Sequence, residues 1–571
     1  MLSLRFEGDD MSEQVRIVKF DESYIQIHTT RAILMELSDR FSFTVPNANF
    51  LTSVKNKYWD GKIRLLNLRS GKLYLGLHTH VKDFCEKNGY ECIYDDPIDV
   101  ENPFSVDEFK RMAAALKLST MTEEGRVDIT PHDYQEQAVI HAIQAPRTLL
   151  LSPTASGKSL MIYILLRYYL ATTKGKALII VPTTNLVQQM YDDFDDYSAK
   201  INWSVPDNCH MIFDGSDKYT DKRVVISTWQ ALAVKERLPK EILEELREQG
   251  KTESQIKAII KKYNKTAPYI LDESYFVDFD TVFGDECHLF ASEDQQGGGE
   301  LIEIMSKLCN ARNRIGTTGT LRDSKVHHLI LEGIFGEVYQ TTTTKQMMDD
   351  KKAAQLFIKC LQLQYQEEER KKMRRTTYQE EMEFLIGHKS RNKFIRNLAL
   401  SLHGNTLVLF ERVEKHGKIL HKMLEEKVAE GRKLFFVHGG TDAEDRNLVR
   451  KITEGETNAI IVASYGTFST GVNIRNIDSL IFASPTKAKV RVLQSIGRGL
   501  RLSARKTTVT LFDIADDLSC WNKAGTEVRD NYSLQHLTER VNYYNTEQFD
   551  YKMYKIQLEA SEPSCSTLSE M

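Results

Sequence analysis

One segment has the composition of a phosphate-binding loop. It reads Ser152-Pro-Thr-Ala-Ser-Gly-Lys-Ser and stands between a short apolar stretch, 148–151, and a helical pattern over 160–170. Backbone amides of such a turn surround phosphates at the N-terminus of the following helix, where a lysine neutralises the β and γ oxygens and a hydroxyl binds Mg²⁺. Ser152 replaces the first glycine of the usual pattern, and a chance Gly-Lys-Ser is the alternative interpretation. The segment predicts ATP and Mg²⁺ as ligands, held by Thr154, Ser156, Gly157, Lys158 and Ser159.

Two acids follow a second apolar strand, in the sequence Asp285-Glu286-Cys287-His288. An acid at the carboxyl end of a parallel strand beside a phosphate loop can hold the nucleotide's Mg²⁺, so we expect Asp285 and Ser159 on the metal. Glu286 is then placed to orient and deprotonate the attacking water. A Cys-His pair also suggests a protease or a metal centre, but no partner ligand has suitable spacing, and we reject that interpretation.

The elements around these residues alternate between short apolar strands and helical patterns. Strands are expected at 148–151, 177–181, 224–227, 281–283 and 314–316, and a second set at 406–410, 433–437, 459–463, 480–483 and 508–512. Such alternation is typical of parallel sheets covered by helices on both faces. The predicted fold is therefore α/β, with two tandem parallel-sheet domains.

The expected organisation has five parts. A small N-terminal α/β module covers 1–105, a linker helix 106–125, a first sheet domain 126–340, a second sheet domain 341–520, and a C-terminal helical extension with a disordered tail 521–571. The first sheet domain carries a charged helical insertion at about 235–265.

The N-terminal module contains a basic, aromatic stretch. Strands are expected at 15–20 and 24–28, and 62–66 and 72–77 flank an Arg-Ser-Gly-Lys turn, which predicts a hairpin. Clustered cations and a tryptophan suit phosphate contact and base stacking. We expect nucleic acid to contact Lys57, Trp59, Lys62 and Arg64. The alternative interpretation is a solvated hairpin with Trp59 in the core.

Composition restricts the class of protein. The 571 residues are 41% hydrophobic and 27% charged, with a mean hydropathy of -0.40 and a net charge of -4. No apolar run approaches the roughly 18 residues of a membrane helix, and the charged N-terminus does not resemble an export signal. The eight cysteines form no C-x-x-C pair, so we expect reduced thiols in the cytoplasm. The slight net acidity means that any nucleic-acid surface is local.

These segments together resemble superfamily 2 helicases of the DExH type. Pro153-Thr-Ala-Ser-Gly-Lys-Ser is similar to motif I and Asp285-Glu-Cys-His to motif II, and the remaining motifs follow in order. The resemblance implies two RecA-like domains, with Gln135 reading the adenine and Gly471 contacting the nucleotide. It implies strand contacts at Pro182, Thr183, Thr228 and Thr467. It also places motif III at Thr317–Thr320 and the motif VI residues at Gln494, Arg498 and Arg501. The two arginines, spaced i and i+3, are expected on one helix face as arginine fingers.

A narrower resemblance covers nearly the whole chain. The sequences Lys57-Tyr-Trp-Asp-Gly-Lys, Tyr378-Gln-Glu-Glu, Arg391-Asn-Lys and Phe468-Ser-Thr-Gly are similar to those of the UvsW helicases of T4-like bacteriophages. It implies an ATP-dependent DNA helicase that acts as a monomer on branched, duplex and single-stranded DNA. Such an enzyme migrates junctions, regresses forks and unwinds R-loops in recombination, repair and replication, with recombination or single-strand-binding proteins as candidate partners.

Other functions fit the same motifs. Motor motifs that contact the backbone do not tell DNA from RNA, since only contacts to the 2′-OH do so; an RNA helicase or a restriction-type translocase therefore stays open. A third hypothesis is an ATP-gated nucleic-acid clamp that does not translocate.

Overall fold

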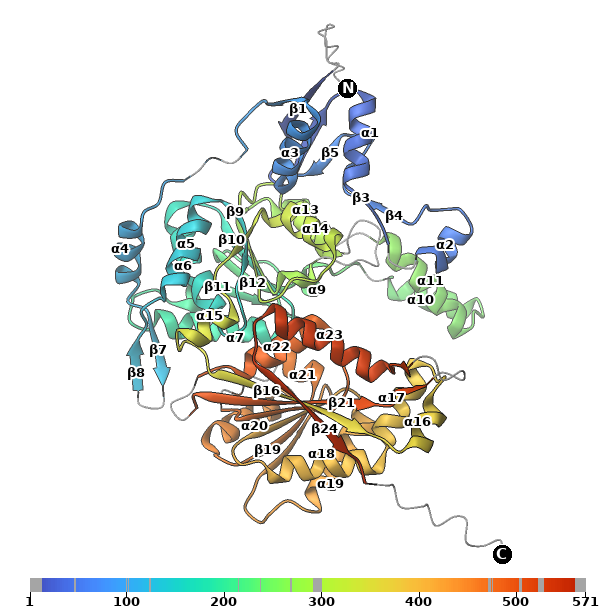
Figure 1. The fold of residues 1–571 in the computed structure, drawn as a ribbon. Coiled ribbons are helices and arrows are strands. Elements are labelled where there is room, and N and C mark those ends of the chain that lie inside the picture. Colours follow the sequence, from blue (N-terminus) through green and yellow to red (C-terminus); the bar gives the residue numbers. More distant parts are fainter. Residues whose placement is uncertain are drawn as a thin grey trace, which may run out of the picture. The chain divides into compact units, whose positions relative to one another are not determined.

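The computed structural model describes residues 13–559 except 46–47, 99, 101, 123–124, 214, 237, 268–269, 291–299, 471–473, 475, 503–505 and 522–527. The chain divides into two compact units: residues 1–151 with 157–341, and residues 152–156 with 342–571. Each unit contains a seven-stranded parallel sheet, and the first also carries a small N-terminal sheet (Figure 1). The predicted fold class, two tandem RecA-like domains with a small α/β module, is confirmed.

The N-terminal module is built on a four-stranded sheet with the order β5-β2-β1-β6. Alternate residues of β1 and β2, such as Ile17 and Ile25, are fully buried, as the two-residue period of a strand requires. Helices α1 and α3 contribute Leu37 and Phe84 to the same core. The module comprises β1 (Gln14–Lys19), β2 (Tyr24–His28), α1 (Arg31–Arg40), β3 (Ser42–Thr44), α2 (Thr52–Lys55), β4 (Lys62–Arg64), β5 (Lys72–Tyr74), α3 (His78–Asn88) and β6 (Glu91–Tyr94).

The hairpin predicted between 62–66 and 72–77 is wrong. A turn does form, because the Gly71 amide donates to the Asn67 carbonyl at 2.8 Å, but the flanking strands pair elsewhere. β4 pairs with β3, and β5 pairs with β2. Leu66 is buried in the core of the module, so the chain leaves β4 before the turn.

The first sheet domain has the strand order β11-β12-β10-β13-β14-β9-β15, with every pair parallel. Neighbouring residues of one strand enter the cores on opposite faces, Leu150 on one side and Leu149 on the other; this explains the continuous apolar runs. Its elements are α5 (Asp133–Gln144), β9 (Arg147–Leu151), α6 (Lys158–Thr172), β10 (Lys176–Val181), α7 (Thr184–Ser198), α8 (Val205–Asn208), β11 (Cys209–Ile212), β12 (Val224–Thr228), α9 (Trp229–Leu232), α12 (Glu273–Phe276), β13 (Phe279–Asp285), α13 (Glu300–Lys307), β14 (Asn313–Thr318), α14 (Lys325–Phe335) and β15 (Val338–Gln340).

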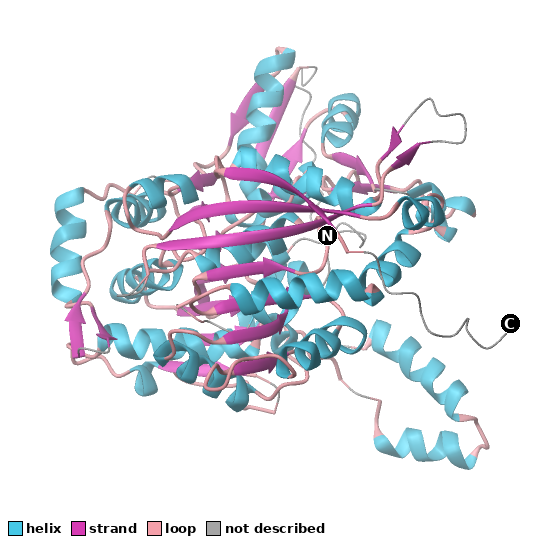
Figure 2. Ribbon diagram, turned by 60° about the horizontal axis from the view of Figure 1, so that its bottom comes forward, coloured by secondary structure: helices cyan, strands magenta, loops and turns pink. Residues whose placement is uncertain are grey.

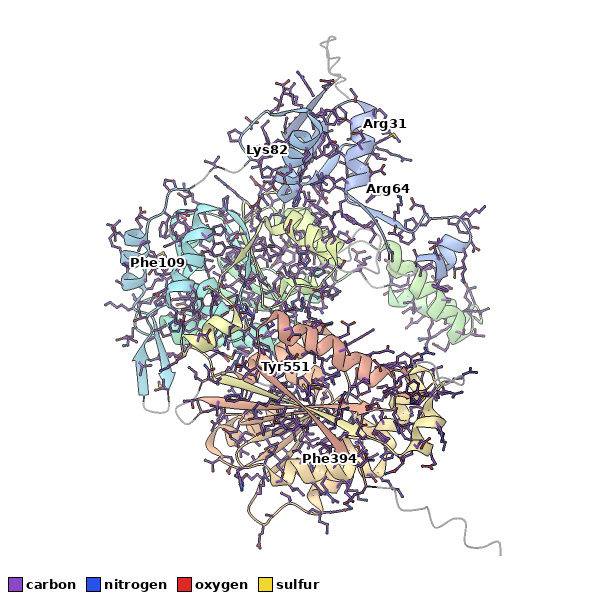
Figure 3. All side chains as sticks on the ribbon, in the orientation of Figure 1. Arg31, Arg64, Lys82, Phe109, Phe394 and Tyr551 are labelled. Atoms are coloured by element: carbon purple, nitrogen blue, oxygen red, sulfur yellow. The ribbon has the colours of Figure 1, made fainter. Side chains whose placement is uncertain are left out.

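The stretch predicted as a linker helix is packed on this domain. Helix α4 (Val106–Leu116) is followed by a hairpin of β7 (Ser119–Thr122) and β8 (Gly125–Asp128). Phe109, which is labelled in Figure 3, and Leu118 lie in the core beside α6. The helix is therefore shorter than expected, and its apolar face is buried.

The helical insertion consists of α10 (Lys240–Glu248) and α11 (Glu253–Thr266). The two helices lie side by side and protrude from their own unit (Figure 2).

None of the helices in the described part of the chain combines the length and apolarity needed to cross a bilayer.

The second sheet domain has the order β18-β19-β17-β20-β21-β16-β24, again with every pair parallel. Its elements are α15 (Thr344–Asp349), β16 (Gln355–Gln364), α16 (Glu367–Met373), α17 (Tyr378–Gly387), α18 (Lys389–Ser401), β17 (Thr406–Phe410), α19 (Lys418–Glu425), β18 (Leu434–Val437), α20 (Ala443–Gly455), β19 (Ile460–Ser464), α21 (Tyr465–Thr470), β20 (Ser479–Phe482), α22 (Lys489–Gly499), β21 (Thr508–Asp517), β22 (Cys520–Trp521), β23 (Val528–Arg529), α23 (Tyr532–Thr546) and β24 (Tyr551–Gln557).

The C-terminal part differs from the expected separate extension. Helix α23 buries Tyr544 in the core of the second domain, and β24, which carries the Tyr551 labelled in Figure 3, pairs with β16. Arg540 of α23 forms a buried ion pair with Asp513 of β21 at 2.8 Å. The second domain therefore extends to about residue 558, and the predicted tail over 560–571 lies outside the described residues.

Candidate nucleotide and nucleic-acid sites

The loop between β9 and α6 has the backbone expected of a phosphate cradle. Gly157 caps α6 with a φ of +79°, in the left-handed region, and Ala155 has a φ of +70°. A Cβ on Gly157 would lie 2.4 Å from Nε2 of Gln135, so this position requires glycine. The Gln135 side chain is 4% exposed, and its Oε1 accepts from the His132 amide at 2.8 Å. Gln135 is thus placed behind the loop, where its side chain supports the turn.

Lys158 and Glu286 form an ion pair. The Nζ of Lys158, in the first turn of α6, lies 3.3 Å from Oε1 of Glu286, just beyond β13, and the two side chains are only 12% and 18% exposed. Burial acts to raise the pKa of Glu286, but the Lys158 and His288 contacts outweigh it, and the net pKa is lowered. The predicted phosphate-binding lysine and the predicted base are therefore brought together, with the carboxylate ionised.

Asp285 lies at the end of β13 in a different environment. Its Oδ1 accepts a hydrogen bond from the Thr317 hydroxyl at 2.8 Å. Burial, together with the neighbouring Glu286 carboxylate, raises the pKa of Asp285. A buried carboxylate whose charged form burial disfavours is a site that a divalent cation would stabilise.

His288 connects the second acid to β14. Its Nδ1 lies 3.3 Å from Oε2 of Glu286 and 2.8 Å from the Thr318 hydroxyl. Its backbone carbonyl contacts Nε2 of His327 on α14 at 2.7 Å. His288 therefore links motif II to motif III.

Among the described residues no group of three His, Cys, Asp or Glu side chains could hold a metal.

The hydroxyl of Ser159 lies 3.0 Å from the Tyr197 hydroxyl of α7. Ser159 and Asp285 offer only oxygen donors, which are the ligands Mg²⁺ prefers. The residues present therefore fit a magnesium ion, provided that the Ser159 hydroxyl exchanges Tyr197 for the metal.

The motif VI residues lie in the second unit. Gln494 and Arg498 are on α22, and the Arg498 guanidinium is 5.9 Å from the Phe468 ring. Arg501 lies beyond the helix, which ends at Gly499. The expectation that Arg498 and Arg501 share one helix face is therefore wrong. The helix stops where the Nζ of buried Lys506 donates to the Gly499 carbonyl at 2.5 Å.

Two predicted motif V residues have different outcomes. Thr467 is 5% exposed, and its hydroxyl lies 2.8 Å from the Ser464 hydroxyl. Gly471 lies outside the described residues. Thr467 is thus held by Ser464, at the end of β19, and must leave that contact to reach a nucleic-acid strand.

Three predicted strand-contacting residues line one groove of the first domain. Pro182 and Thr183 immediately precede α7, and Thr228 precedes α9, where its hydroxyl accepts from the Ala231 amide at 3.3 Å. The groove has a volume of about 1040 Å³ and is also bordered by Tyr263 of the helical insertion. The fold therefore brings Pro182, Thr183 and Thr228 together.

The basic stretch of the N-terminal module is only partly available. Trp59 is half-buried against a small core that includes Ile63, and its Nε1 donates to the Lys62 carbonyl at 3.0 Å. Arg64, labelled in Figure 3, pairs with Asp60, and this hydrogen bond lowers the pKa of Asp60 to about 2. Lys57 and Lys62 are exposed. This packing of Trp59 matches the alternative interpretation, whereas the two lysines face solvent.

Comparison with known proteins identifies the family. Residues 14–95 match the family model "DNA helicase UvsW, N-terminal", residues 128–323 match "Type III restriction enzyme, res subunit", and residues 389–503 match "Helicase conserved C-terminal domain". The ATP-dependent DNA helicase uvsW of Enterobacteria phage T4 is 34% identical over 555 residues, which are 95% of this chain and 100% of the relative. The chain belongs to the UvsW helicase family.

Two solved structures are also similar to this chain. The crystal structure of T4 UvsW is 31% identical, with a TM-score of 0.47, and the match covers 96% of this chain and 100% of that one. The ATP-dependent type ISP restriction-modification enzyme LlaBIII bound to DNA matches with a TM-score of 0.50 at 15% identity, over 84% of this chain and 34% of that chain. At 15% identity, the match to LlaBIII shows that the two chains share a fold and shows nothing about function.

Sequence reasoning did not find three contacting residues. Tyr197 holds the Ser159 hydroxyl, and His327 contacts the His288 carbonyl; neither lies in a pattern that marks a site. Tyr263 borders the groove. The sequence does show Tyr263 as an aromatic residue among the lysines of the helical insertion. Helical periodicity alone does not show where that insertion lies in the fold.

Proposed function

We propose that this chain is an ATP-dependent DNA helicase that remodels branched DNA by junction migration, fork regression and R-loop unwinding, in recombination, repair and replication. The observation that carries the ATPase part is the 3.3 Å pairing of Lys158 with Glu286, within the nucleotide site of a RecA-like domain. The DNA part is supported by the full-length relationship to a phage T4 protein named as an ATP-dependent DNA helicase.

In the proposed mechanism, ATP draws Lys158 away from Glu286. Lys158 then neutralises the β and γ oxygens, the amides of Thr154, Ser156 and Gly157 surround the phosphates, and Gly471 contacts the nucleotide. The released Glu286 carboxylate accepts a proton from the attacking water. When bound through Ser159 and Asp285, Mg²⁺ would neutralise phosphate charge. Gln494, Arg498 and Arg501 of the second domain act on the γ-phosphate.

Motif III is suited to report the state of the nucleotide. Thr317 holds Asp285 directly, and Thr318 holds His288, which in turn contacts Glu286, so both acids of motif II are linked to neighbouring residues of β14. A change in the charge on either acid therefore alters a hydrogen bond to the same strand. Such a change can bias a two-state movement between domains, which is how ATP turnover becomes motion along DNA.

The nucleic acid is proposed to contact Pro182, Thr183 and Thr228 in the first domain, Thr467 in the second, and the exposed Lys57 and Lys62 of the N-terminal module. These groups address phosphate and sugar, which implies little base specificity. The Trp59 and Arg64 contacts require local release from Ile63 and Asp60.

Steady-state ATP turnover tests the proposal. Turnover is measured without nucleic acid and with single-stranded DNA, duplex DNA, a four-way junction and structured RNA, each paired with gel-based strand separation. We expect the strongest stimulation by branched DNA, with strand exchange, and loss of turnover in Lys158→Ala with DNA binding retained. Stimulation by RNA alone would indicate an RNA helicase, and stimulation without strand movement would indicate a clamp.

A further inference from the structure

The helical insertion forms a self-contained arm, defined here as α10 and α11. Its base is closed, because the Ile270 amide donates to the Val234 carbonyl at 2.9 Å. Ile256 of α11 is 2% exposed, and Thr252 and Gln255 form a capping box that fixes the start of α11. The arm therefore keeps its own structure while it is attached to the sheet domain at one place.

One side of the arm borders the groove described above. The groove is lined by Thr183, Thr184 and Gln230 of the sheet domain, which we call the floor, and by Pro239 and Tyr263, which we call the wall. Pro239 directly precedes α10, and Tyr263 lies near the end of α11. The arm thus borders the same groove as the residues expected to contact the strand.

The floor has the chemistry of a phosphate site. Thr183 caps the 15-residue helix α7 without a side-chain hydrogen bond to it. The Thr183 Oγ1 is buried and has no hydrogen-bond partner among the described residues. A helix N-terminus attracts anions, and a buried hydroxyl without a partner favours a ligand that supplies one.

The wall has the chemistry that suits bases and a polyanion. Tyr263 provides a ring, and Lys218 and Lys235 also line the groove, against one acid, Glu236. Helix α11 carries four lysines and a single acid, whereas α10 carries four glutamates. The helix whose tyrosine reaches the groove is therefore the basic one. This charge distribution complements a nucleic-acid strand.

We propose that the arm closes the groove over a single strand of DNA, with Tyr263 stacked on a base. The inference rests on the proposed function and adds to it a further strand-binding element. Stacking on an aromatic side chain tolerates any base, as a translocating enzyme requires. The lysines of α11 add an electrostatic attraction that salt weakens.

Equilibrium binding of a fluorescent oligothymidylate tests the proposal in the full chain. Tyr263→Ala is expected to weaken binding about tenfold, or about 1.4 kcal/mol, while Tyr263→Phe retains binding. Tyr219→Ala is the matched control, because Tyr219 is 62% exposed and does not line the groove. Thermal unfolding confirms that each variant is folded. Binding by Tyr263→Ala within twofold of the unmodified protein would overturn the proposal.

Excision of the arm provides a second variant. Because Val234 and Ile270 are hydrogen-bonded, residues 236–268 can be replaced by a short Gly-Ser linker. The excised protein is expected to lose at least as much affinity as Tyr263→Ala and to show a shallower salt dependence. Unchanged affinity and unchanged salt dependence would contradict a strand-binding arm.

A floor variant separates failure of the arm from failure of the groove. Thr184 is exposed at the first position of α7, where an acid favours the helix but repels phosphate. Thr184→Glu should weaken binding strongly, and the uncharged Thr184→Gln should not. If only Thr184→Glu weakens binding, the arm is not a strand contact and the proposed function stands. If neither Thr184→Glu nor Tyr263→Ala weakens binding, the groove itself is not the strand site.

Discussion

Replacing Glu286 with glutamine should tighten ATP binding while it abolishes turnover. In the structure the Nζ of Lys158 lies 3.3 Å from Oε1 of Glu286, and both side chains are mostly buried. ATP has to break this contact before Lys158 can reach the phosphates. A hydrogen bond to a charged group contributes about 1.5–3 kcal/mol, and an amide retains part of it. We therefore expect a gain of about 1.4 kcal/mol, or about tenfold in Kd.

The assay is a titration with a fluorescent ATP analogue without nucleic acid, paired with steady-state turnover. Turnover should fall by at least about 100-fold, because the general base is lost. The matched control is Glu273→Gln, which makes the same chemical change at an exposed position at the start of α12. Unchanged or weaker ATP binding by Glu286→Gln would refute the idea that the ion pair competes with the nucleotide.

Three further predictions concern stability and docking. Arg391→Met leaves the fully buried Asp516 without its cation and should destabilise the second domain by about 3–5 kcal/mol in urea unfolding, with recovery in the double variant that also carries Asp516→Asn. Gly76→Ala would place a Cβ 2.1 Å from a carbonyl oxygen of α14, which should separate the N-terminal module from the sheet domain. Limited proteolysis should then release the module. Gly439→Ala, where a Cβ would lie in open space, is the control and should not change the digestion pattern. Burial lowers the pKa of His416 to about 3, so the unfolded state binds more protons below about pH 6.5. This histidine should contribute a loss of up to about 1.4 kcal/mol per pH unit on acidification. His416→Asn should reduce the slope of stability against pH by that amount in thermal unfolding between pH 6.5 and 5, while His327 and His536, whose pKa values burial also lowers, keep their contributions.

Local sequence was sufficient for most interior strands of the two sheets. Strand β17 has the predicted bounds, 406–410, because a strand buried on both faces forms a nearly continuous apolar run. The interior strand β16, whose first residues alternate between exposed and buried, and the edge strands β11, β15 and β24 were missed. Only four of the seven β24 residues are hydrophobic, and most of the strand is exposed. Its pairing with β16 therefore depends on contacts between residues far apart in the sequence.

The motif residues were found for a related reason. A phosphate loop needs glycine where φ is positive and a lysine at the helix start, so Gly157 and Lys158 are recognisable from type and spacing alone. The helix that carries Arg498 was also recognisable, but its end was not. That end depends on Lys506, seven residues beyond Gly499, whose ammonium group meets the Gly499 carbonyl only after folding.

The sequence by itself determined which groups are candidates for the chemistry: the phosphate loop and the two acids after β13 follow from residue type at fixed short spacing, and the arginines after β20 follow from the resemblance to motif VI. Tertiary structure alone decided what these groups touch. Glu286 meets Lys158 from 128 positions away in the chain, and Tyr263 lines the same groove as Thr183. Such contacts are made by the stacking of strands and the burial of apolar faces, which no local pattern encodes.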